Sequence, residues 1–145
     1  MFDSILDETA QHWGRCQSRR VDIALNSEHA IAIIDDSSSV RRALESLLRS
    51  LGFVVLSFES AEAFLTSPSV LATSCVVTDV EMPGLTGIDL YERMRSDKNQ
   101  TPVIFITANS EQKVRQRLGN TPCVLNKPFE VDELAACINQ AIATP

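Results

Sequence analysis

Apolar and polar positions follow two different rhythms along this chain. Uninterrupted apolar runs occur at residues 30–34 and 103–106, and such runs are typical of strands buried on both faces. Between the runs, apolar residues recur every three or four positions, which predicts amphipathic helices. Strands are predicted at residues 30–34, 53–58, 75–78, 103–106 and 123–125. Helices are predicted at residues 40–51, 61–65, 87–95, 111–118 and 131–142.

The predicted helices begin and end at residues with suitable capping chemistry. Serines stand before the first two helices, at residues 37–39 and at Ser60, where a hydroxyl can accept a free backbone N–H. Gly52 and Gly119 follow two of the helices, as is common at C-terminal ends. Alternating strands and helices require parallel strands joined by right-handed crossovers. The predicted fold class is therefore α/β, a three-layer sandwich of the flavodoxin-like kind, with a five-stranded parallel sheet of order 2-1-3-4-5.

Residues 1–28 show no comparable pattern. Their apolar side chains have only a loosely helical spacing: Phe2, Ile5, Leu6 and Trp13. We predict an N-terminal extension over residues 1–28, partly helical or a linker, followed by a single domain over residues 29–145. The segment is either a partly ordered extension or a docking segment that packs its apolar side on the domain or on a partner.

The chain of 145 residues carries a net charge of −6. This acidic balance argues against non-specific binding to nucleic acid or to anionic membranes. No run approaches the roughly 18 apolar residues that a membrane span requires. Acidic residues near the N-terminus also differ from a secretory signal. We therefore expect a cytoplasmic protein that binds neither nucleic acid nor a membrane.

The four cysteines form no recognisable metal or redox motif. None is part of a C-x-x-C pair, and no histidine cluster accompanies them: Cys16, Cys75, Cys123 and Cys137. In a reducing cytosol this distribution favours buried free thiols over disulfides or a zinc site.

Polar residues with chemical potential follow four of the predicted strands. Asp35 and Asp36 end the first strand, Asp79 ends the third, Thr107 ends the fourth and Lys127 follows the fifth. A single aspartate at such a position is often only a cap for the next turn. Because the carboxyl ends of parallel strands share one edge of the sheet, however, these five side chains are expected to converge there.

Three carboxylates in one place repel each other. Two unit charges about 4 Å apart cost roughly 4 kcal/mol at an effective dielectric of 20. A divalent cation offsets this repulsion, and a hard oxygen site of this kind suits Mg²⁺. Lys127 adds a compact positive charge and Thr107 adds a hydroxyl donor, so the set predicts phosphoryl transfer to Asp79. The alternative is a purely metal-binding or structural acidic cluster, which would need neither the lysine nor the threonine.

Over about residues 29–143, the sequence resembles the receiver domain of two-component response regulators. The resemblance rests on Asp35-Asp36, Asp79 with Met82-Pro83-Gly84 and Gly87, Thr107-Ala108, and Lys127-Pro128-Phe129. The spacings agree as well, with 43 residues from Asp36 to Asp79 and 28 from Asp79 to Thr107. Residues 57–65 are similar to the branch that usually carries a helix-turn-helix output domain of the LuxR/FixJ type.

The resemblance implies a signalling switch rather than an enzyme. A sensor histidine kinase or a phosphotransfer protein would pass a phosphoryl group to Asp79, and the chain's own chemistry would be limited to Mg²⁺-dependent self-phosphorylation and autodephosphorylation. Asp36 and Asp79 would bind Mg²⁺ directly, together with the backbone carbonyl of Glu81, while Asp35 acts mostly through water. Thr107 and Lys127 would hold the phosphoryl oxygens.

The resemblance also implies a small Ala108 that keeps the acceptor accessible and a cis Lys127-Pro128 bond. Output would pass to a second copy of the chain or to a downstream effector protein. Two features depart from the family pattern: Val124 replaces the usual aromatic residue, and only 20 residues separate Thr107 from Lys127, about two fewer than is common.

The departures leave open an alternative function, a receiver-like protein-interaction module that acts without phosphorylation. The chain ends at Pro145, just after the last predicted helix. Either a stand-alone receiver or a piece of a longer regulator is compatible with that ending.

Overall fold

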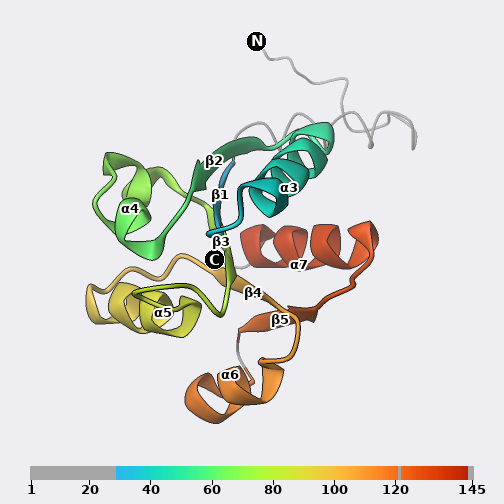
Figure 1. The fold of residues 1–145 in the computed structure, drawn as a ribbon. Coiled ribbons are helices and arrows are strands. Elements are labelled where there is room, and N and C mark those ends of the chain that lie inside the picture. Colours follow the sequence, from blue (N-terminus) through green and yellow to red (C-terminus); the bar gives the residue numbers. More distant parts are fainter. Residues whose placement is uncertain (1–28, 121, 144–145) are drawn as a thin grey trace.

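The computed structural model describes residues 29–120 and 122–143, in which strands and helices alternate (Figure 1). The expectations for residues 1–28, including Cys16, lie outside the described residues. The strands are β1 (Ala30–Ile34), β2 (Val54–Phe58), β3 (Cys75–Asp79), β4 (Val103–Thr107) and β5 (Cys123–Asn126). The helices are α3 (Ser38–Ser50), α4 (Ala61–Leu65), the 3-10 helix η2 (Pro68–Ala72), α5 (Gly87–Ser96), α6 (Glu111–Leu118) and α7 (Val131–Ala143).

All five strands belong to one parallel sheet of order β2-β1-β3-β4-β5, which confirms the predicted fold class. The register pairs Ile34 with Thr78 and Asp79 with Ile106, and it pairs Thr107 with Asn126. The strands therefore reach the same edge of the sheet together. This alignment brings the polar residues at the carboxyl ends of β1, β3, β4 and β5 into one region.

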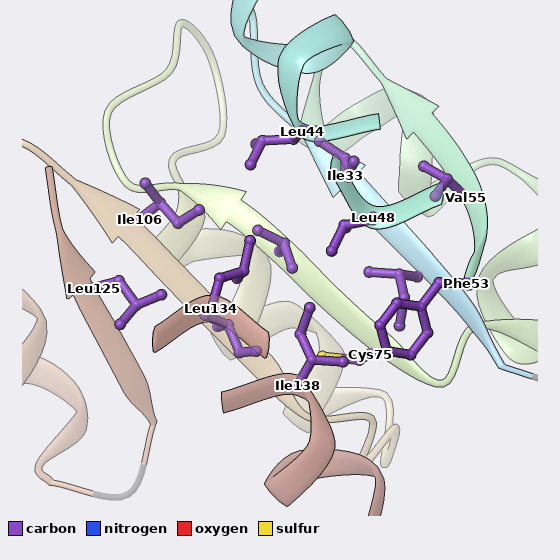
Figure 2. Packing of buried hydrophobic residues seen from close by; sticks show 13 residues of the cluster. Ile33, Leu44, Leu48, Phe53, Val55, Cys75, Ile106, Leu125, Leu134 and Ile138 are labelled. Carbon is purple, nitrogen blue, oxygen red and sulfur yellow. The ribbon is translucent and has the colours of Figure 1, made fainter. Parts of the chain in front are cut away.

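Two apolar layers hold the helices on the sheet. Ile31 and Ile33 of β1 face α3 and α7, whereas Ala32 and Ile34 face the layer of α4, α5 and α6, and all four are fully buried. Figure 2 shows the first layer, in which the side chains of the two helices lie over the sheet: Leu44, Leu48, Leu134 and Ile138. Complete burial of each such side chain contributes about 1.5–3 kcal/mol. The uninterrupted apolar runs thus reflect strands covered on both faces.

Most predicted helix ends are present. The Ser37 hydroxyl accepts the N–H of Val40 at the start of α3, and Gly52 follows that helix with a φ of 97°. Helix α4 ends at Leu65, as predicted, and Pro68 begins the separate 3-10 helix η2, which was not predicted. A proline is well suited to the first turn of a helix because it lacks the backbone N–H.

The cysteine prediction is correct for one residue and wrong for two. Cys75 is a buried free thiol, whereas Cys123 of β5 and Cys137 of α7 form a disulfide. Packing of α7 beside β5 brings their Cα atoms to 6.7 Å, and disulfides usually span about 4.4–6.8 Å. No helix within the described ranges is long and apolar enough to cross a membrane.

Candidate functional site

Three carboxylates meet at the carboxyl edge of the sheet. Asp35 and Asp36 follow β1, Asp79 is the last residue of β3, and one oxygen from each lies within 4.8 Å of the others. Asp35 is buried at 3% exposure, Asp79 is half-buried and Asp36 is exposed. The expected convergence of these carboxylates is therefore present, and the group is exposed to solvent at Asp36.

The backbone around β1 fixes Asp35 in place. Its side-chain oxygen Oδ1 accepts the N–H of Ser37 at 2.8 Å, and its carbonyl accepts a hydrogen bond from Arg41 Nη1 at 2.6 Å. Its own N–H donates to the carbonyl of Phe58 at 3.2 Å. The same serine begins α3, so the cap of the helix and the position of the acidic group depend on one turn.

Burial and mutual repulsion raise the pKa values of two carboxyls. Desolvation raises the pKa of Asp35 above its usual range, against the opposing hydrogen bond from Ser37. Desolvation also raises the pKa of Asp79, the charge of Asp35 raises it further, and Lys127 acts in the opposite direction. The ionised site thus holds negative charge that Lys127 and, at Asp35, Arg41 compensate only in part.

Thr107 and Lys127 lie on the same side of the site. Thr107 is 1% exposed at the end of β4, and its Oγ1 accepts the N–H groups of Ser110 at 2.8 Å and of Asn109 at 3.3 Å. The N–H of Lys127 donates to the carbonyl of Thr107 at 2.8 Å. Lys127 attracts both Asp35 and Asp79 electrostatically, and its bond to Pro128 is cis, as the resemblance implies.

The loop that follows Asp79 is packed closely against α5. The N–H of Gly87 donates to the carbonyl of Val80 at 2.9 Å, and a Cβ at position 87 would lie 2.4 Å from the carbonyl oxygen of Asp79. Glu62 of α4 accepts the N–H of Leu85 at 3.1 Å and holds the other side of the loop. The backbone thus permits only glycine beside the candidate acceptor.

The side chain of Glu81 belongs to a second polar group beside the site, which was not predicted from the sequence. The Glu81 carboxylate accepts hydrogen bonds from Ser110 Oγ at 2.8 Å and from Lys113 Nζ at 2.9 Å. Lys113, and then Ser110, lower the pKa of Glu81. We call these three residues the Glu81 cluster. It joins the loop after β3 to the start of α6 across 29 or more residues, a separation at which the sequence has no local signal.

Val124 lies where receivers usually have an aromatic ring. It is half-buried and packs on the apolar layer that contains Phe105 and Tyr91. The rings of those two residues have centroids 6.0 Å apart, and the guanidinium of Arg95 lies 4.3 Å from the centroid of Tyr91. Valine therefore contributes a short apolar contact to this layer and has no polar tip.

The donor set is suited to a hard divalent cation. Carboxylate oxygens are the ligands that Mg²⁺ prefers, and one or two carboxylates with several waters complete its usual shell. Burial, and then the charge of Asp35, raise the pKa of Asp79, so a cation beside it would stabilise its ionised form. The residues present therefore fit a Mg²⁺ ion. The Glu81 side chain is directed to α6, and its backbone carbonyl remains an expected ligand.

Comparison with known proteins identifies the family. The model of the response regulator receiver domain matches residues 31–139. The transcriptional regulatory protein FixJ of Bradyrhizobium diazoefficiens is 40% identical over 114 residues, which cover 77% of this chain and 56% of FixJ. This chain thus spans about half the length of the curated relatives that it matches.

Solved structures agree with this assignment. The crystal structure of FixJ-N superimposes with a TM-score of 0.73 at 30% identity, covering 81% of this chain and 95% of FixJ-N. The receiver domain of the sensor histidine kinase PA1611 from Pseudomonas aeruginosa PAO1, with a magnesium ion coordinated in its active site cleft, gives a TM-score of 0.71 at 25% identity and covers 80% and 98%. The chain belongs to the receiver domain family of two-component response regulators.

Proposed function

We propose that Asp79 receives a phosphoryl group from a phosphohistidine of a sensor kinase or a phosphotransfer protein. One observation carries the proposal: a half-buried carboxylate at the end of β3 has two further carboxylates within 4.8 Å and Lys127 acting on it. A nucleophile, a cation site and a positive group are the components that phosphoryl transfer requires.

The reaction is a substitution at phosphorus. A carboxylate oxygen of Asp79 attacks the phosphorus, the P–N bond of the donor breaks, and the imidazole leaves as a neutral group after taking a proton. The product is an aspartyl phosphate. Ala108 is exposed and small, so it leaves the approach to Asp79 open. The protein's task is to orient the groups and to stabilise the charge that develops.

Asp36 and Asp79 would hold Mg²⁺ directly, with the Glu81 carbonyl, and Asp35 would act mostly through water. The magnesium ion in the PA1611 receiver domain supports this choice of metal. When bound, Mg²⁺ neutralises negative charge on the acceptor and on the phosphoryl oxygens. Lys127 and Thr107 would bind the phosphoryl oxygens that the ion leaves free.

Thr107 connects the site to α6. The Oγ1 of Thr107 accepts the N–H groups of Ser110 and Asn109, and we infer that Thr107 moves toward the new charge on Asp79 and shifts these two bonds when its hydroxyl donates to a phosphoryl oxygen. Ser110 also donates to Glu81, so this movement disturbs the Glu81 cluster. Helix α6 has one buried residue, Val114, and no side-chain cap, so it is the least anchored of the described α-helices.

The proposed output is therefore a change in the order or position of residues 108–123. Hydrogen exchange should be compared with and without the phosphoryl mimic beryllofluoride. We expect the largest change in protection within that segment. Changes confined to α3 and α7 would show that the signal leaves by another face.

Downstream, the FixJ relationship supports an output domain or an effector protein as the recipient of the signal. The alternative of a receiver-like module without phosphorylation has little support. Its motivation was Val124, but the substitution leaves the acceptor, the carboxylate pair, Thr107 and Lys127 unaffected. The phosphoacceptor function accounts for more of the site.

Labelling with a small phosphodonor tests the proposal directly. The protein should gain one phosphoryl group in the presence of Mg²⁺ and acetyl phosphate, as measured by intact mass, and it should gain none in the presence of EDTA. Asp79→Asn should not be labelled. Asp97→Asn is the matched control, because Asp97 is an exposed carboxylate paired with Arg93 at the end of α5. Equal labelling of Asp79→Asn and the native protein would refute the assignment.

A further inference from the structure

Cys123 and Cys137 differ from the third described cysteine in their surroundings. Both are half-buried and bonded to each other, one at the start of β5 and the other in the middle of α7. Cys75 is fully buried, and burial raises its pKa to about 12, so it carries almost no reactive thiolate. We therefore expect Cys123 and Cys137, but not Cys75, to react with a disulfide reagent in solution.

The Cys123–Cys137 bond closes a segment that contains part of the candidate site. The two cysteines are 14 residues apart, and Lys127 and the first turns of α7 lie between them. Strand β5 is an edge strand that pairs only with β4 among the described elements, so the sheet restrains it from one side. Leu134 and Ile138 anchor α7 by burial. The disulfide adds a covalent restraint to a helix that otherwise depends on packing.

A cavity gives solvent access to both cysteines. It has a volume of about 690 Å³, and Cys123 and Cys137 line it together with Val124, Tyr91, Arg95 and Arg115. Two of the lining residues are arginines and none is acidic. A small anionic disulfide therefore has both a route to the sulfur atoms and a favourable electrostatic environment.

We propose that Cys123 and Cys137 are a reversible dithiol–disulfide site that reacts with a low-molecular-weight anionic peptide disulfide and fixes α7 to β5 when oxidised. In the oxidising direction, one cysteine thiolate attacks a sulfur of the reagent, forms a mixed disulfide and releases one reagent thiolate. The second cysteine then attacks the protein-bound sulfur and releases the other. The protein pair loses two electrons and two protons, and the reagent disulfide is reduced to two thiols.

The site is independent of phosphoryl transfer at Asp79. It requires only that two thiols approach each other, and its failure would not bear on the acceptor. Its effect would nevertheless reach Lys127, because that residue lies within the closed segment.

Peptide mapping can identify the bond without ambiguity. Trypsin leaves both cysteines in the peptide 118–145, since the only basic residue between them, Lys127, precedes a proline. A second protease specific for glutamate cuts after residues 130 and 133 and separates the cysteines. The full chain is reduced, equilibrated with glutathione disulfide, blocked with an alkylating reagent and digested. We expect the two cysteine peptides to remain linked and to separate on reduction.

Variants and a stability measurement complete the test. Cys75→Ala should retain the linked peptides, whereas Cys137→Ser should lose them and still fold, as judged by circular dichroism. Oxidation should raise the Tm of the native chain by about 10 °C and should leave that of Cys137→Ser unchanged. Free alkylation of both cysteines after equilibration, or links to Cys16 or Cys75 instead, would overturn the site. Equal Tm values for oxidised and reduced native protein would overturn the restraint on α7.

Discussion

Replacing Asp79 with asparagine should stabilise the metal-free protein at neutral pH. The native carboxylate is half-buried beside Asp35, and desolvation and repulsion both oppose its ionised form. Asparagine has nearly the same shape, and its oxygen can still accept the backbone hydrogen bonds that Asp79 receives from Val80 and Glu81. Its NH₂ group can donate to Asp35. The substitution thus removes a charge and leaves the surrounding packing unchanged.

The carboxylate geometry sets the size of the effect. Within the acidic group the oxygens lie within 4.8 Å. Two unit charges at about that separation repel by roughly 3.5 kcal/mol at an effective dielectric of 20. Solvent reaches half-buried Asp79, and Lys127 already compensates part of the charge. After this discount we expect the free energy of unfolding to rise by about 1–2 kcal/mol.

The same reasoning fixes the sign of the pH dependence. The pKa of Asp79 is raised above its ordinary value of 3.8, so the folded protein holds this proton more tightly than the unfolded chain does. The free energy of unfolding therefore falls as pH rises from 3.8 through the raised pKa, and the full penalty is present above it. Asp79→Asn should flatten this fall.

Urea unfolding in the presence of EDTA measures the effect. The native protein, Asp79→Asn and the surface control Asp97→Asn should be compared at about pH 7.5 and about pH 5, and the control should change by less than about 0.5 kcal/mol. Saturating Mg²⁺ should then stabilise the native protein more than Asp79→Asn, because a ligand stabilises the state that binds it.

Two results would refute this reasoning. One is an Asp79→Asn variant that is no more stable than the native protein in EDTA while Asp97→Asn remains neutral. The other is equal stabilisation of the native protein and Asp79→Asn by Mg²⁺. The first would mean that burial and repulsion at Asp79 are compensated in the free protein, and the second that the ion binds elsewhere.

Three further predictions follow from the surroundings of the site. Gly87→Ala should cost about 1–3 kcal/mol of stability in urea and lower the extent of acetyl phosphate labelling, because its Cβ meets the carbonyl of Asp79. Gly119→Ala has open space but a φ of +76°, so it should cost about 1–3 kcal/mol through backbone strain and still label normally; equally lowered labelling of both variants would contradict this. Lys113→Met should change the free energy of unfolding by less than about 1 kcal/mol, because the ion pair between Lys113 and Glu81 is exposed. The same variant should speed hydrogen exchange in α6, and unchanged exchange would exclude a role for the Glu81 cluster in holding that helix. The affinity for Mg²⁺ should fall as pH decreases toward the raised pKa values of Asp35 and Asp79, because protons compete with the ion for the carboxylates. Calorimetry from about pH 8 to about pH 5 measures this fall, and an affinity that does not change with pH would argue against these carboxylates as ligands.

The sequence was sufficient to predict the sheet because its strands are buried on both faces. Successive side chains of residues 30–34 face the two apolar layers alternately, so both faces of the strand are buried. Such a strand is apolar at every position and is easily recognised in the sequence. The convergence of the carboxylates follows from the same fact, because parallel strands end at one edge. Long-range topology alone therefore placed Asp35, Asp36 and Asp79 together.

What the sequence did not predict depends on contacts between distant side chains. Glu81 and Lys113 are 32 residues apart and lie on a loop and a helix, so neither spacing nor composition links them. The bond between Cys123 and Cys137 requires the packing of α7 on β5, and a count of cysteines favoured free thiols. Helix α6 is expected to be weak because Val114 and Leu118 are its only apolar residues, and its one buried residue, Val114, agrees with that expectation.

The hydrogen bond from the N–H of Lys127 to the carbonyl of Thr107 fixes the position of Lys127 relative to β4. That position therefore does not depend on the length of the connection between β4 and β5. The strand ladder, with Thr107 opposite Asn126, sets where the lysine stands, whatever number of residues the chain uses to return. A connection about two residues shorter than is common can therefore close without moving Lys127. Insertions at exposed Gly119 and Asn120, near the opposite edge of the sheet, should likewise be tolerated. That turn is where a reporter peptide could be grafted, or where related chains could diverge in length, without disturbing the acceptor.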